Sequence, residues 1–191
     1  DTVGAGEGLA RPTGLAFDRG RNVLYVVDTL GHRIVGFDGE GRRVMESGRR
    51  GQGDGEFNYP VAVAVDAAGR LYVSDSMNFR VQVLDASGRF LRAFGGPGTG
   101  PGGFDKAKGI ALDPDGDVYV VEGLHDVIHV FDAEGRLLTV VGGTGTQAGE
   151  FGLPAGIHID PSGRILVADS ANHRIQILRY LGNAAAGAGG S

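Results

Sequence analysis

Two imidazoles and two carboxylates lie close together in one short segment of the chain. Glu122, His125, Asp126 and His129 are side chains of the kinds that bind a transition metal or transfer protons in acid–base catalysis. Strand alternation places His125 and His129 on one face only if the strand already includes His125. The same residues also fit a solvated acidic loop followed by a His129 packed in the interior, and the sequence leaves both interpretations open.

His158 is a second candidate for chemistry. It occupies a position at which three similar segments carry Ala16, Ala64 and Ala111. A histidine there is either a hydrogen-bonded interior residue or a group presented to a central channel. A zinc site needs at least three protein ligands, so His158 by itself predicts no metal centre. His173 belongs to a predicted hairpin loop, too far along the strand to join it.

Lys108 and Phe79 could contact a ligand without catalysing a reaction. Lys108 begins a predicted strand and is expected to have no basic neighbours, which makes it a poor phosphate clamp. Phe79 and Tyr59 are the aromatic residues of the predicted loops, few for a protein that stacks the bases of single-stranded RNA. We predict no catalytic residue, no metal and no cofactor; the candidate ligand-binding residues are Phe79, Lys108, Glu122, His125, Asp126, His158 and His173.

The composition limits the classes of partner. The 191 residues carry 18 Lys and Arg against 23 Asp and Glu, a net charge of −5, whereas proteins that neutralise several phosphates carry a basic excess. No apolar stretch approaches the ~18 residues of a membrane-spanning helix. The chain has no cysteine, which excludes disulfides and thiolate metal ligands. We expect neither a nucleic-acid partner nor membrane insertion.

Three series of residues recur along the chain at a nearly constant interval. Two series keep a step of 47 residues, and the third has steps of 48, 47 and 47. Such self-similarity is the signature of a repeat architecture. The series are Asp28, Asp75, Glu122 and Asp169; Phe57, Phe104 and Phe151; and Asp18, Asp66, Asp113 and Asp160.

Within one repeat, every signal is typical of strands and turns. In the second repeat, apolar runs at 61–66, 71–75, 80–85 and 89–94 alternate with short turns, the pattern of an antiparallel meander. The runs are apolar at nearly every position, which strands need only when both faces are buried. Radial stacking of sheets around an axis buries both faces. The sequence therefore predicts an all-β fold, a β-propeller of four repeats that each form a four-stranded antiparallel blade.

The last blade is predicted to be incomplete. The first three repeats end with a fourth strand, at 42–47, 89–94 and 136–141, whereas residues 183–191 are Ala- and Gly-rich and typical of a flexible tail or linker. Residues 2–4 align with the end of a fourth strand but are too few to complete the blade. We expect an open blade edge, which could pair with another copy of the chain.

An acid that ends the second strand and an arginine that begins the third recur in three repeats. Their hairpin positions bring them together, and a charge-assisted pair would brace the loop. Because the pair recurs in each blade, its expected role is structural. The third repeat breaks the pattern with Val127. The pairs are Asp28 and Arg33, Asp75 and Arg80, and Asp169 and Arg174.

Residues 73–83 and 167–177 resemble the core of an NHL repeat, as do residues 27–35 and the lead-ins at 55–60 and 149–154. The resemblance covers residues from about 6 to 180 and implies a propeller over 1–182. Such propellers include RNA- and protein-binding domains and extracytoplasmic sensor domains of bacterial kinases; similar propellers include metal-dependent lyases and lactonases. Family members generally have about six blades, so four repeats mean an excised piece, closure with four blades, or copies that combine. The implied blades span about 9–52, 57–99, 104–146 and 151–182.

These observations favour a non-enzymatic scaffold that binds a protein, peptide or small ligand, or that assembles with copies of itself. The alternative is a metal-dependent lyase or lactonase with an ion near His158. A third reading, an RNA-binding NHL domain, is disfavoured by the net charge and the scarce loop aromatics. The resemblance slightly favours an extracytoplasmic location, although the sequence itself names no compartment.

Overall fold

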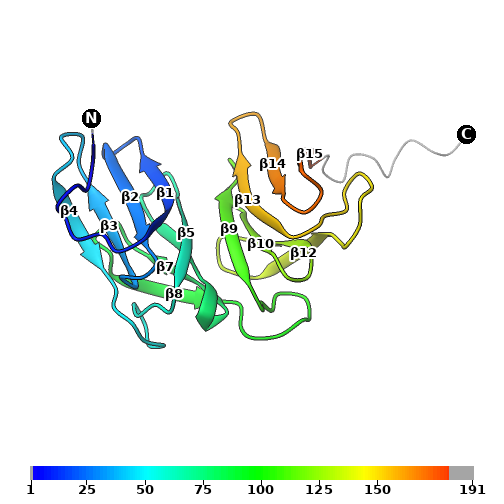
Figure 1. Cartoon of the computed structure of the whole chain (residues 1–191), viewed down its shortest axis with the longest axis horizontal. Helices are drawn as coiled ribbons and strands as arrows, with labels where there is room; N and C mark the ends of the chain where they lie inside the picture. Colours follow the sequence, from blue (N-terminus) through cyan, green and yellow to red (C-terminus); the bar gives the residue numbers. More distant parts are fainter. Residues whose placement is uncertain (1, 181–191) are drawn as a thin grey trace, which may run out of the picture.

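Four antiparallel sheets follow one another along the chain and are arranged as the blades of a propeller (Figure 1). The computed structural model describes residues 2–180. Strands pair in sequence order within each sheet, and a single 3₁₀ turn, η1 (Ser76–Asn78), interrupts the β structure of this range. The all-β propeller predicted from the repeat is therefore confirmed.

Each of the first three blades has four strands, and blade 4 has three among the described residues. Blade 1 contains β1 (Pro12–Asp18), β2 (Val23–Asp28), β3 (Arg33–Phe37) and β4 (Arg43–Ser47). Blade 2 contains β5 (Pro60–Val65), β6 (Leu71–Asp75), β7 (Arg80–Leu84) and β8 (Phe90–Phe94). Blade 3 contains β9 (Ala107–Leu112), β10 (Val118–Glu122), β11 (Val127–Phe131) and β12 (Leu137–Gly142). Blade 4 contains β13 (Pro154–Ile159), β14 (Arg164–Asp169) and β15 (Arg174–Arg179).

The core consists of apolar layers between successive blades. The sequence places apolar side chains at consecutive strand positions, so each blade has one face for the blade before it and one for the blade after it. Tyr25, Val27 and Ile34 of blade 1 pack with Val63 and Leu71 of blade 2. Equivalent layers lie between blades 2 and 3 and between blades 3 and 4. This packing is the physical reason for the continuous apolar runs.

The innermost strands β1, β5, β9 and β13 contact one another in that order around the axis. Gly14 and Gly109 permit the close approach of two of these pairs. A Cβ atom at Gly109 would lie 2.7 Å from the carbonyl oxygen of Ala155 on the next blade, and one at Gly14 would lie 2.8 Å from Cα of Ala62. No larger residue fits at either position without a shift of the neighbouring strand.

The outward faces of the two end blades carry exposed apolar side chains. Leu15 and Phe17 of β1 are 64% and 50% exposed, and Ile175 and Ile177 of β15 are 63% and 60% exposed. Their repeat equivalents at the internal joints are buried or half-buried. Blades 1 and 4 therefore each present a face without a neighbouring blade in this part of the chain.

The predicted open edge of blade 4 corresponds to β15, which pairs only with β14 within residues 2–180. Residues 2–8 form no strand there; Gly4 instead lies near Leu9 and Phe37, over the open face of blade 1. The predicted tail at 183–191 lies outside the described residues. No helix in the described range is long and apolar enough to span a membrane.

Candidate functional site

The four innermost strands line a groove along the axis. One end has a volume of ≈ 640 Å³ and is bordered by residues from β1, β5, β9 and β13, including Thr13, Val61 and Gly156. The opposite end has a volume of ≈ 660 Å³ and is lined by the turns after these strands. Every blade contributes to both ends, so the groove exists only because the blades converge.

Three cations border the first end of the groove. Arg11 and Lys106 are exposed and Lys108 is half-buried, and all three line the same cavity. None of them forms an ion pair within residues 2–180. Sequence reasoning expected Lys108 to lack basic neighbours, whereas Lys106 and Arg11 of blade 1 line the same cavity. We call Arg11, Lys106 and Lys108 the cationic mouth.

Apolar and hydroxyl groups form the rest of this mouth. Tyr59, Met77 and Val61 lie beside Arg11 and Lys106 in an adjoining hollow of ≈ 490 Å³. The Thr29 hydroxyl donates to the carbonyl oxygen of Pro60 at 2.6 Å and lies 2.6 Å from the Thr13 hydroxyl. The mouth thus combines positive charge with apolar surface.

The opposite end of the groove is acidic. Asp113 and Asp115 line it beside His158, Arg19 and Asp160. Burial, together with the charges of Asp113, Asp115 and Asp132, raises the pKa of the neighbouring Asp117. The Asp160 carboxylate is already paired with Arg164 at 2.7 Å. The groove therefore runs from a positive end to a negative one.

His158 lies at this acidic end, with its side chain exposed. Of the two placements that the sequence left open for His158, interior or facing the channel, the structure has the one that faces the channel. The described residues contain no group of three His, Cys, Asp or Glu side chains placed to hold a metal ion.

The acidic and imidazole groups of the third repeat have separate partners. The buried Glu122 carboxylate accepts the N–H groups of Asp105 and Lys106, the latter at 2.8 Å. His125 lies in the loop before β11 and contacts Asp105 at 2.7 Å. Asp126 is buried and accepts the N–H of Leu153 on blade 4 at 2.6 Å. Glu122 and His125 therefore brace the loop around Asp105, whereas Asp126 connects blade 3 to blade 4.

His129 is packed between blades. Its side chain is 4% exposed and its ring centroid lies 5.4 Å from that of Phe104. Burial lowers the pKa of His129, although the Glu122 charge opposes the shift. This placement agrees with the interior reading of His129 rather than with a shared site.

Phe79 and His173 occupy equivalent loop positions with left-handed backbone, at φ 57° and φ 54°. Phe79 is half-buried against the core between blades 2 and 3, whereas His173 is exposed. Their counterpart in blade 1, His32, accepts the N–H of Tyr59 on blade 2 through Nδ1 at 3.1 Å. Sequence reasoning missed that His32 connects blade 1 to blade 2. The available signal was that this loop position recurs every 47 residues.

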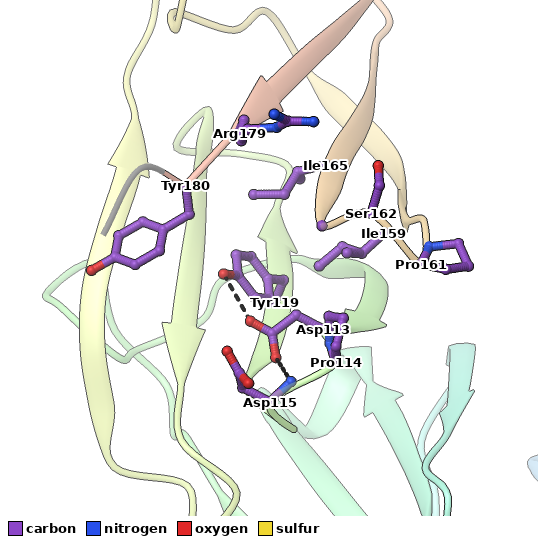
Figure 2. Close-up of a pocket in the computed structure, with 11 residues that line it drawn as sticks. Asp113, Pro114, Asp115, Tyr119, Ile159, Pro161, Ser162, Ile165, Arg179 and Tyr180 are labelled. Atoms are coloured by element: carbon purple, nitrogen blue, oxygen red, sulfur yellow. Dashed lines mark hydrogen bonds between the residues drawn. The ribbon is translucent and has the colours of Figure 1, made fainter. Parts of the chain in front are cut away.

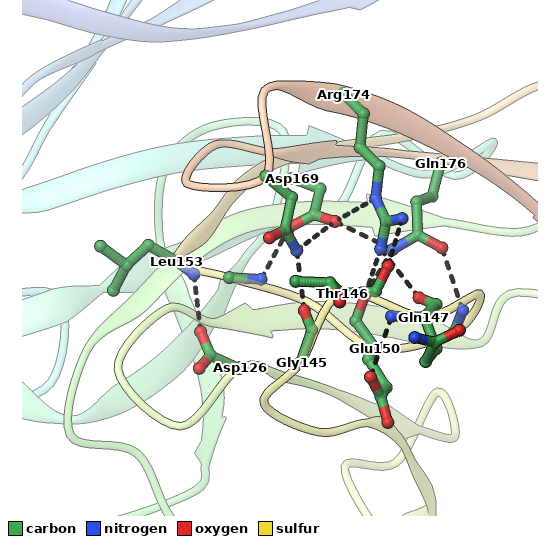
Figure 3. A network of polar contacts seen from close by, with 12 residues as sticks. Asp126, Gly145, Thr146, Gln147, Glu150, Leu153, Asp169, Arg174 and Gln176 are labelled. Carbon is green, nitrogen blue, oxygen red and sulfur yellow. Dashed lines mark hydrogen bonds and ion pairs between the residues drawn. The ribbon is translucent and has the colours of Figure 1, made fainter.

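The expected brace pairs form ion pairs of 3.1 Å for Asp28–Arg33, 3.0 Å for Asp75–Arg80 and 2.7 Å for Asp169–Arg174. Each aspartate is fully buried. Figure 3 shows the blade 4 network, in which Arg174 also donates to the carbonyl oxygen of Glu150 at 2.9 Å. The arginine therefore ties the hairpin to the lead-in loop of its own blade.

Asp169 receives four kinds of donor. The backbone N–H of Gly152 and Nε of Arg174 both donate at 2.7 Å, and Nε2 of Gln176 donates at 3.0 Å, with Asn172 completing the set. Burial by itself would raise the pKa of Asp169, but these hydrogen bonds outweigh it and lower the pKa from 3.8 to about 2. The carboxylate is a structural anchor.

A further hollow of ≈ 380 Å³ lies between blades 3 and 4 (Figure 2). Tyr119 donates its hydroxyl to Asp113 at 3.3 Å there. At the joint between blades 1 and 2, the equivalent Tyr25 hydroxyl points to the carbonyl oxygen of Ala86, 3.5 Å away, on the turn before the fourth strand. The hollow adjoins Tyr180, where the described chain ends, and we assign no ligand to it.

Comparison with solved structures gives matches at low sequence identity. A streptogramin B lyase matches with 16% identity over 92% of this chain and 56% of the other, with a TM-score of 0.63. A Kuenenia stuttgartiensis hydrazine synthase matches with 20% identity over 90% and 50%, with a TM-score of 0.64. A chain of a nidogen/laminin complex matches with 23% identity over 89% and 65%, with a TM-score of 0.63.

These likenesses establish the fold alone. The chain spans about half the length of the solved structures it matches first. No curated protein sequence matches it. The NHL repeat model matches residues 57–84 and 151–178, which lie in blades 2 and 4. The chain is therefore a β-propeller in which two of the four described blades match the NHL repeat.

Proposed function

We propose that the chain is a non-enzymatic propeller scaffold that binds a protein or peptide in its axial groove, with self-assembly as its second capacity. The observation that carries the first part is the cationic mouth. Arg11 and Lys106, from two blades, border an apolar hollow, and Lys108 lines the adjoining end of the groove. None of the three forms an ion pair within residues 2–180. A cation without a partner beside apolar surface favours an acidic, partly apolar ligand.

The polarity of the groove specifies the orientation of such a ligand. The cationic mouth would receive glutamate or aspartate side chains or a C-terminal carboxylate. Asp113 and Asp115 at the other end would repel them. An extended segment therefore binds with its acidic part at Arg11 and Lys106.

The experiment is a titration with a labelled peptide of alternating Glu and Leu, followed by fluorescence anisotropy. A Lys–Leu peptide is the ligand control. The protein variant is Arg11→Glu with Lys106→Glu, and the matched control is Arg42→Glu, which reverses an exposed arginine on a turn outside the groove. We expect the double variant to weaken binding by about tenfold or more, since each tenfold is about 1.4 kcal/mol, and added salt to weaken wild-type binding.

Equal affinity for the two peptides, or an unchanged affinity of the double variant, would refute the groove as the binding site. The enzymatic alternative rests on the exposed His158 at the acidic end of the groove. Metal analysis of the purified protein tests it, because a stoichiometric ion that is lost in His158→Ala would favour a metal-dependent lyase or lactonase.

A further inference from the structure

The outward faces of blades 1 and 4 carry residues at the same repeat positions that form the contacts between neighbouring blades. Phe17 of blade 1 occupies the repeat position of Val65, Leu112 and Ile159, which face the preceding blade. Ile177 of blade 4 occupies the position of Val83 and Val130, which face the following blade and are 0% and 4% exposed. Blade 1 therefore presents the face that contacts a preceding blade at the internal joints. Blade 4 presents the face that contacts a following blade.

We propose that the open face of blade 4 docks on the open face of blade 1 of a second copy of this chain, so that two copies close a ring of eight blades. This proposal deepens the self-assembly part of the proposed function and is independent of ligand binding in the groove. Such an interface repeats, between chains, the contact that each blade already makes within the chain.

The two open faces depart from the repeat in complementary ways. At each internal joint a tyrosine packs in one cluster with an aliphatic residue of the next blade, as Tyr72 does with Leu112. On blade 4 the tyrosine position holds the smaller Leu166. On blade 1 the aliphatic position holds the larger Phe17. The lost tyrosine ring of one face is thus offset by the added ring of the other, which keeps the joint volume nearly constant.

The tyrosine positions confirm that this exchange is confined to the open ends. Each internal joint has the same pairing of tyrosine with an aliphatic residue. The pairs are Tyr25 with Val65, Tyr72 with Leu112, and Tyr119 with Ile159.

Backbone hydrogen bonds differ among the three joints. In blades 2 and 4, the N–H groups of Tyr59 and Leu153 are accepted by His32 and Asp126 of the preceding blade. In blades 1 and 3 the equivalent N–H groups, of Arg11 and Lys106, bond to the acid of their own blade, at 2.8 Å in both cases. Blade 1 therefore needs no acceptor from a preceding blade.

The corresponding loop position of blade 4 holds His173, the counterpart of His32. On a second copy the N–H of Arg11 is already bonded to Asp28. Docking of blade 4 on blade 1 therefore requires no backbone hydrogen bond between the two copies.

Two copies related by a two-fold axis would satisfy both open faces of each chain, so that no apolar end face remains.

The first test is the molecular mass of the whole chain in solution, by analytical ultracentrifugation over a dilution series. We expect a dimer of about 39 kDa, twice the 19.7 kDa of one chain, that dissociates on dilution. A monomer at all concentrations would overturn the proposal and assign the faces to other blades or another protein. Open-ended larger species would overturn it as well, since they mean that two copies do not close.

The second test uses conservative substitutions at the proposed contact. Leu166→Tyr places two large rings against each other, and overpacking by about 1.4 kcal/mol weakens each joint about tenfold, or the dimer about a hundredfold. Adding Phe17→Leu restores the internal pairing and is expected to restore dimerisation. Leu124→Tyr, on an exposed loop, is the matched control.

Equal weakening of the single and the double variant, or no weakening of either, would overturn the pairing of Phe17 with Leu166. Both side chains lie on the open faces, so far-UV circular dichroism is expected to show the native β signal in all variants. Titration of the Glu–Leu peptide into the same variants keeps the two proposals separate, because the cationic mouth is intact in each.

Discussion

Replacement of Asp169 by asparagine tests whether the buried acid anchors blade 4. Asp169 is 0% exposed and its Oδ2 accepts from Arg174 at 2.7 Å and Gln176 at 3.0 Å. An asparagine keeps one acceptor oxygen but presents an NH₂ group to these donors. Breaking a buried ion pair costs about 3 to 5 kcal/mol, and because the Arg174 side chain is 32% exposed, we expect a loss of roughly 3 kcal/mol at pH 7.

The pH dependence of this loss gives a second signature. The pKa of Asp169 falls from 3.8 to about 2 because its hydrogen bonds outweigh the effect of burial. A depressed pKa contributes stability that is present above pH 3.8 and lost as the pH falls towards 2. At about 1.4 kcal/mol per pH unit, this contribution is about 2 kcal/mol. The difference between wild type and Asp169→Asn should therefore shrink over that range.

The assay is urea unfolding followed by circular dichroism, with hydrogen exchange of the β14 and β15 amides to localise the effect. The matched control is Asp132→Asn, since Asp132 pairs with Arg136 at 2.6 Å on an exposed turn and such a pair contributes about 1 kcal/mol or less. A loss below 1 kcal/mol in Asp169→Asn, or a loss that does not change between pH 4 and pH 2, would refute the anchoring role.

Three further substitutions probe the blade joints and the buried polar groups. Gly109→Val should destabilise the fold by about 1 to 3 kcal/mol in urea unfolding through overpacking, whereas Gly96→Ala, with nothing within 4 Å of its added Cβ, should change little. Gln82→Leu removes donors to Glu56 and Asp75 and should cost about 2 kcal/mol; an unchanged midpoint would contradict this. Burial lowers the pKa of His129, so its neutral form stabilises the fold above the unfolded pKa of about 6.5 and this contribution is lost below it. His129→Leu should remove that acid-sensitive step, and persistence of the step would assign it to another group.

Much of the fold was predictable because strand pairing within a blade is local. The 47-residue step, the apolar runs and the turns specify four meanders, and the acid–arginine pairs lie five residues apart across one hairpin. Asp75 and Arg80 illustrate this, since their 3.0 Å ion pair follows from adjacent strands alone. Four blades with an open edge on the last one could be inferred without coordinates, whereas the closure of the ring could not.

The candidate site was less predictable because it depends on how the blades are rotated relative to one another. Glu122, His125, Asp126 and His129 are neighbours in sequence, yet the structure distributes them over a loop, a joint and an interior layer. A linear cluster says nothing about which face of a blade each side chain meets. The proximity in sequence was therefore a poor guide to shared chemistry.

The sequence by itself determined the repeat, the strands, the braces and the NHL resemblance, all of which rest on contacts within about 47 residues. Only the tertiary structure decided that Arg11 and Lys106 border one groove, that His32 and Asp126 join blades, and that Phe17 and Ile177 lie on open faces. The physical reason is that convergence on an axis is a property of blade packing. Small rotations at each joint add up over four blades, and no local pattern records their sum.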